Sequence, residues 1–106
     1  MRTDVTTWRR WVFEIRAPAD EFLERLGRGL AVRGIHVEPG EHFDLILRGF
    51  GARAFLQARW VDEGLEVRAK LKAGLFSSKP ALERVILDAG REAQAELTFE
   101  KGARRA

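Results

Sequence analysis

The chain has 106 residues and a formal net charge of +3, with 45% hydrophobic and 33% charged residues. This length fits a single domain over residues 1–106, and the composition excludes an intrinsically disordered chain. The absence of cysteine excludes disulfide frameworks, thiolate nucleophiles and cysteine-ligated zinc. We also expect a cytoplasmic protein without a membrane partner, because no apolar run reaches the roughly 20 residues of a membrane span and residues 1–5 lack the apolar stretch of a signal peptide.

Residues 5–16 predict a strand, because apolar and polar side chains alternate with a period of two. Trp11 lies on the apolar side of this strand, whereas Trp8 lies on the other side with the charged residues. A helix follows, which Pro18 opens, since its missing N–H costs nothing in a first turn, and Gly34 predicts the end of the helix. The apolar stripe of this helix consists of Phe22, Leu23, Leu26 and Leu30.

Residues 35–48 predict a β-hairpin with a three-residue Pro-Gly-Glu turn. In this register His36 faces Asp44 and Glu38 faces His42, so that all four polar side chains share one face of the sheet. Two imidazoles and two carboxylates are a candidate site for zinc or iron. We favour the alternative of a solvated face with cross-strand ion pairs, and therefore expect no cofactor.

The next segment has two interpretations. Residues 49–54 match the dinucleotide fingerprint G-x-G-x-x-A after a strand, but that fingerprint requires a helix to follow, and a glycine-rich turn is the simpler interpretation. Residues 53–61 fit a short helix or a strand. We prefer a strand, because a turn at residues 62–64 leads into a clearly alternating strand over residues 65–72.

The clearest helix begins near Pro80, with Ser77 or Ser78 as its cap, and its helical pattern weakens near residues 98–99. Its buried stripe consists of Leu82, Val85, Ile86, Ala89, Ala93 and Leu97. A short, flexible basic tail is expected at about residues 101–106.

These elements predict an α+β fold of order β-α-β-β-β-β-α, in which one antiparallel sheet of about five strands carries both helices on its apolar face. The opposite face would carry the charged residues, with the aromatic side chains Trp8 and Phe55 among them. Such a mixture of cations and aromatics suits single-stranded nucleic acid, although acidic residues on the same face cancel much of the field. The candidate binding residues are Trp8, Arg10, Phe55, Arg59, Arg68 and Lys70.

Most of the basic residues are arginine, which is favoured where planar contacts to carboxylate or phosphate matter. A GC-rich genome or a heat-adapted host is the simpler explanation of this bias. We expect no enzyme and no catalytic residue, because tyrosine is absent, both serines resemble helix caps, and the carboxylates of Asp62 and Glu63 fall in a turn.

The segment Trp11–Phe22, in which a strand runs through Ala17 and Pro18 into a helix, resembles the start of the helix-grip proteins. These are the START and polyketide-cyclase-like superfamily. The resemblance implies a sheet that wraps the long final helix and encloses a cavity for a hydrophobic ligand. The chain is shorter than the usual members, and the resemblance assigns no binding residue.

Three functional hypotheses follow from the sequence. We favour a non-catalytic interaction or oligomerisation module with a protein partner or a second copy, because aromatics and arginine concentrate in protein interfaces. The first alternative is nucleic-acid binding through the basic and aromatic face of the sheet. The second alternative is a small carrier of hydrophobic ligands of the helix-grip type.

Overall fold

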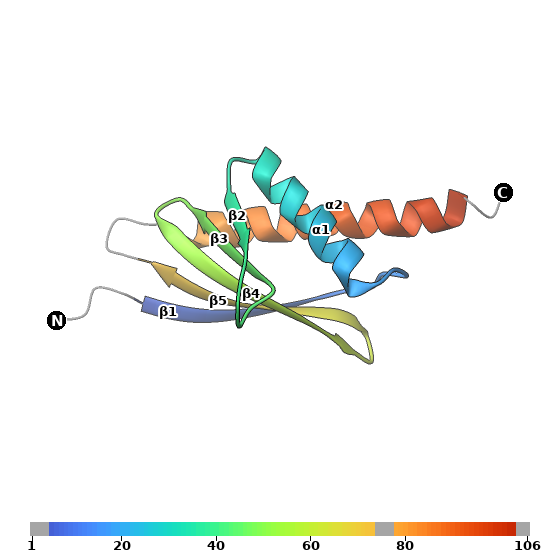
Figure 1. Cartoon of the computed structure of the whole chain (residues 1–106), viewed down its shortest axis with the longest axis horizontal. Coiled ribbons are helices and arrows are strands. Elements are labelled where there is room, and N and C mark those ends of the chain that lie inside the picture. The colour runs from blue at the N-terminus through green and yellow to red at the C-terminus, as the bar shows by residue number, and fades with distance from the viewer. Residues whose placement is uncertain (1–4, 74–77, 104–106) are drawn as a thin grey trace.

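The computed structural model describes residues 5–73 and 78–103, and it describes side chains for residues 6–73 and 78–98. The described chain forms the predicted α+β fold, with five strands and two helices in the predicted order (Figure 1). The elements are β1 (Val5–Phe13), α1 (Ala19–Val32), β2 (His36–Pro39), β3 (Leu45–Gly49), β4 (Ala52–Val61), β5 (Gly64–Ala73) and α2 (Lys79–Ala103).

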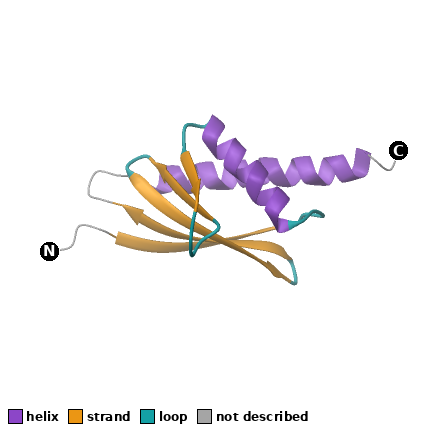
Figure 2. Cartoon of the chain, viewed as in Figure 1, coloured by secondary structure: helices purple, strands orange, loops and turns teal. Residues whose placement is uncertain are grey.

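The five strands form one antiparallel sheet in the order β1-β5-β4-β3-β2. Strand β1 is therefore paired with β5, the last strand in the chain, over its whole length. Both helices lie on the same side of the sheet, where α2 contacts β1, β5 and β4, and α1 contacts α2 and β2 (Figure 2). The helices leave the opposite side of the sheet uncovered in the part of the chain that the structure describes.

The core lies between the sheet and the two helices. Strand β5 supplies its centre, because Leu65, Val67, Ala69 and Leu71 point toward the helices and are fully buried. Each buried leucine or valine side chain stabilises the fold by about 1.5–3 kcal/mol relative to an exposed one. The ring centroids of Phe13 on β1 and Phe22 on α1 lie 5.1 Å apart and connect the sheet to the first helix.

Helix α1 ends as predicted at Gly34. The N–H of Gly34 donates to the carbonyl of Ala31, and the N–H of Ile35 donates to the carbonyl of Leu30, each at 3.0 Å. These two bonds satisfy carbonyls that the end of a helix would otherwise leave without donors. Leu30 and Ile35 are both buried, so this turn directs the chain from α1 straight into β2.

The predicted three-residue turn between β2 and β3 is wrong. The connection covers residues 40–44, and His36 pairs with Arg48 instead of Asp44. The physical reason is that both the backbone and the side chain of Asp44 are hydrogen-bonded to β4. Its N–H donates to the carbonyl of Leu56 at 2.8 Å, and its carboxylate accepts the N–H of Ala58 at 2.7 Å.

Residues 52–61 form strand β4, as preferred above, so the G-x-G-x-x-A motif is not followed by the helix that dinucleotide binding requires. Phe50 and Gly51 form the turn between β3 and β4, and their φ angles are 56° and 73°. Two successive positive φ values are typical of the two-residue turns that match the twist of a hairpin.

Helix α2 is capped by Ser78, whose Oγ accepts the N–H of Ala81 at 3.3 Å, while Ser77 lies outside the described residues. The predicted stripe of α2 is buried, except that Val85 is only partly buried. The helix continues to Ala103. The backbone of residues 101–103, the start of the predicted basic tail, is therefore helical, and residues 104–106 lie outside the described part of the chain.

The contact between Gly90 of α2 and the ring of Phe13 gives a test of this packing. A Cβ atom added at Gly90 would lie 2.5 Å from Cζ of Phe13, whereas one added at Gly27 of α1 would lie 3.5 Å from Val37, an ordinary contact. Overpacking costs about 1–3 kcal/mol, and alanine in a helix gains about 1 kcal/mol over glycine.

We therefore expect Gly90→Ala to lower the free energy of unfolding and the matched control Gly27→Ala to raise it by up to about 1 kcal/mol. Urea denaturation monitored by circular dichroism measures both changes. A Gly90→Ala variant as stable as the Gly27→Ala variant would contradict the close approach of β1 to α2.

Candidate binding face of the sheet

The side of the sheet that the helices do not cover is called the open face here, and all five strands contribute to it. The strand pairing and the burial of the alternate residues define which side chains belong to it. It consists of Thr6, Trp8, Arg10, Val12, His36, Glu38, Ile46, Arg48, Arg53, Phe55, Gln57, Arg59, Val61, Glu66, Arg68, Lys70 and Lys72. It contains all six of the binding residues predicted from the sequence.

Basic side chains stand directly opposite one another on three neighbouring strands of the open face. Lys72 of β5 pairs with Arg53 of β4, and Arg53 pairs with Arg48 of β3. His36 of β2 continues the line. We call Lys72, Arg53 and Arg48 the cationic row. Like charges at opposed positions about 5 Å apart repel each other and destabilise the sheet unless an anion offsets them.

A second line of side chains runs beside the cationic row and is mostly apolar. Trp8 of β1 pairs with Lys70, Lys70 with Phe55, and Phe55 with Ile46 of β3. The Trp8 side chain is 52% exposed, although the Arg68 guanidinium and the Lys70 ammonium lie 5.5 and 5.9 Å from its ring centroid. We call Trp8, Phe55 and Ile46 the aromatic row.

The open face carries far more positive charge than the rest of the molecule. It holds five arginines, two lysines and only two carboxylates, those of Glu38 and Glu66. The resulting excess of five positive charges exceeds the +3 of the whole chain. Two further acidic residues, Glu14 and Asp44, lie outside the paired strands, although the Asp44 carboxylate accepts a hydrogen bond from the backbone of β4.

Glu66 is the one carboxylate at the centre of this face, and its side chain is only 2% exposed. It forms ion pairs with Arg10 of β1 and with Arg59 of β4, the latter at 2.8 Å between Nε and Oε1. Hydrogen bonds from Arg10 first and Arg59 second hold the pKa of Glu66 below its ordinary value. Two of the predicted binding residues, Arg10 and Arg59, are thus already engaged with a carboxylate.

Four of the five remaining cations of the open face differ in this respect, and the fifth, Arg48, is paired with Glu38. Within the described part of the chain, Arg53, Arg68, Lys70 and Lys72 have no carboxylate within ion-pair distance. Arg48 lies 3.6 Å from Glu38, which also contacts the His36 imidazole at 3.1 Å. The hydrogen bond to His36, followed by the charge of Arg48, lowers the pKa of Glu38.

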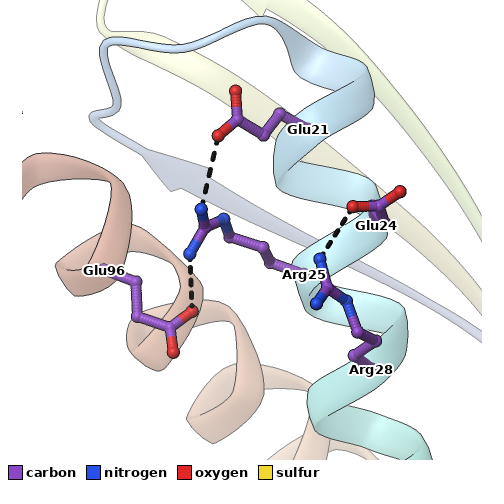
Figure 3. Close-up of polar contacts among 5 residues, drawn as sticks. All are labelled: Glu21, Glu24, Arg25, Arg28 and Glu96. Carbon is purple, nitrogen blue, oxygen red and sulfur yellow. Dashed lines mark hydrogen bonds and ion pairs between the residues drawn. The ribbon is translucent and has the colours of Figure 1, made fainter. Parts of the chain in front are cut away.

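The arginines of α1 show a different arrangement, because Arg25 and Arg28 are paired with glutamates (Figure 3), whereas Arg84 and Arg91 of α2 have no ion pair among the described residues. Arg25 of α1 reaches both Glu21 on its own helix and Glu96 on α2, each at 3.4 Å, and Arg28 contacts Glu24 at 2.7 Å. Such exposed pairs contribute little to stability, but they neutralise the charge of these arginines. Among the described residues, the open face therefore holds more unpaired cations than the helices, namely Arg53, Arg68, Lys70 and Lys72 against Arg84 and Arg91.

The structure does not bring the predicted metal ligands together. His36 and Glu38 lie on the open face, but His42 and Asp44 belong to the loop of residues 40–44. The nearest carboxylate to His42 is that of its neighbour Glu41, at 3.7 Å. No group of three metal-binding side chains occurs among the residues that the structure describes.

Comparisons with protein-family models, with curated proteins and with solved structures gave no match. The resemblance to helix-grip proteins therefore stays a prediction. Neither of the two helices, as far as the chain is described, is long and apolar enough to cross a membrane.

The position of Glu66 predicts a pH dependence of stability. Its pKa is lower in the folded than in the unfolded state, so the unfolded chain binds more protons between the two values and stability rises with pH there. The contribution is complete above the unfolded glutamate pKa of about 4.3, and it is lost as the pH falls through the folded-state pKa.

We expect Glu66→Gln to reduce the loss of unfolding free energy between neutral and acid pH. The matched control is Glu63→Gln in the turn between β4 and β5, for which no ion pair is described, and it should retain the full pH dependence. Urea denaturation across this pH range measures the effect. Identical pH profiles for the two variants would contradict the pairing of Glu66 with the two arginines.

Proposed function

We propose that the protein is a non-catalytic, cytoplasmic nucleic-acid-binding domain that uses the open face of its sheet. The observation that carries this proposal is the cationic row, in which Lys72, Arg53 and Arg48 oppose one another directly. Phosphates offset such repulsion because each brings a negative charge, and a nucleic acid brings several at regular spacing.

The charge of the open face argues against self-association through this surface. A second copy would bring the same excess of positive charge against it, and like charges across an interface oppose binding. A protein partner would have to be strongly acidic. The interaction module expected from the sequence is therefore less well supported than its nucleic-acid alternative.

The packing between sheet and helices gives no support to the ligand-carrier alternative. An added Cβ at Gly90 of α2 would collide with Phe13 of β1, so these two elements have no space between them at this point. Trp8, one of the two most exposed aromatic side chains of the sheet, lies on the face away from the helices.

Fluorescence anisotropy with a labelled single-stranded oligonucleotide tests the proposal. We expect binding at low salt, with a logarithm of affinity that falls linearly with the logarithm of salt concentration. Arg53→Gln should weaken binding and reduce the salt slope by about 1. The control Arg84→Gln removes the same charge from an exposed position on α2 and should change neither quantity.

Absence of binding at low salt, or equal effects of the two substitutions, would contradict the proposal. So would equally tight binding of polyglutamate, because that result would identify an acidic protein as the partner.

A further inference from the structure

The two rows of the open face lie side by side and run in the same direction. Both cross the strands, since each passes from one strand to its paired neighbour. Residues two positions apart on a strand are separated by about 7 Å, so the cationic row and the aromatic row are about 7 Å apart. Along the second line the Trp8 ring is exposed, whereas the Phe55 ring is partly buried and packs against Phe43 of the preceding loop, with ring centroids 5.3 Å apart.

This pattern distinguishes between kinds of nucleic acid. In a single strand the phosphates lie along one edge and the bases along the other. The bases of a single strand are also free to stack on aromatic side chains. In a duplex the base faces are stacked on one another, so no base would be free to stack on the exposed Trp8 ring. A purely electrostatic site would also need no exposed indole beside its cations.

The end of the cationic row supplies a second observation. A surface depression of about 410 Å³ is lined by Arg48 and Arg53 together with Gly49, Gly51 and Ala52 at the turn between β3 and β4. Gly51 is exposed and has no side chain, so a phosphate can approach the backbone of this turn closely between two guanidinium groups.

From these observations we infer that a single strand crosses the sheet perpendicular to the β-strands, with its phosphates along Lys72, Arg53 and Arg48 and a base stacked on Trp8. This inference rests on the proposed function and adds the class of nucleic acid and its path. The cationic row spans two strand spacings, about 10 Å, which favours a footprint at the short end of the range for small domains, about four nucleotides.

The two exposed tryptophans give a matched test. Trp8 and Trp60 are each 52% exposed, but Trp8 points to the open face and Trp60 to the opposite side of the sheet. Binding of an oligothymidine of about eight nucleotides and of a duplex of the same length is measured by anisotropy at several salt concentrations.

We expect Trp8→Ala to weaken single-strand binding about tenfold or more with an unchanged salt slope, and Trp60→Ala to leave it unaltered. Trp8→Phe should retain most of the affinity, because it keeps a ring on which a base can stack, and circular dichroism verifies that each variant is folded. The wild-type protein should bind the duplex more weakly than the single strand.

The outcomes separate the inference from the function on which it rests. If the wild type binds and Arg53→Gln weakens binding, but Trp8→Ala has no effect or the duplex binds equally well, the proposed function stands and the single-strand path is wrong. If the wild type binds no oligonucleotide at low salt, both the proposed function and the inferred single-strand path are wrong.

Discussion

Strand β5 is paired along its whole length with β1 on one side and with β4 on the other, and its side chains alternate strictly between the two faces of the sheet. Leu65, Val67, Ala69 and Leu71 must be covered, and the two helices cover them. The same alternation fixes Glu66, Arg68, Lys70 and Lys72 on the opposite side. Because one residue cannot change sides without moving its neighbours, the burial of the core and the charge of the open face are set by a single pattern.

The distribution of charge follows from this constraint and separates the molecule into two layers. In the helical layer, arginines such as Arg25 meet glutamates of the same or the neighbouring helix. On the open face only Glu66 and Glu38 offset seven cations, and both are already paired. Glu66 has a structural role here, since it joins Arg10 and Arg59 across three strands at the centre of a positive surface. Among the described residues, Arg53, Arg68, Lys70 and Lys72 have no carboxylate partner, and their free charge is the basis of the functional proposal.

The fold was predictable because its patterns are local. The alternation in β1 and β5, the termination of α1 at Gly34 and the capping of α2 by Ser78 each depend on a few neighbouring residues. The hairpin register was not predictable, because Asp44 binds β4, a strand that the local pattern of residues 35–48 does not include. The cationic row was missed for the same reason: Lys72 and Arg48 lie 24 positions apart in the sequence, and only the strand order β5-β4-β3 places them in one line. The individual binding residues were found, whereas their arrangement required the strand pairing.

The most direct test of the account uses the three tryptophan indole N–H groups as reporters in a ¹H–¹⁵N correlation spectrum during titration with a single-stranded oligonucleotide. Trp8 lies on the open face, and Trp11 and Trp60 lie on the side of the sheet that faces the helices. We expect the Trp8 signal to shift in proportion to binding, together with the backbone amides of the cationic row, while the Trp60 signal stays in place. Shifts of Trp60 or of the amides of α2 without a shift of Trp8 would contradict it, because the nucleic acid would then bind the opposite side of the molecule.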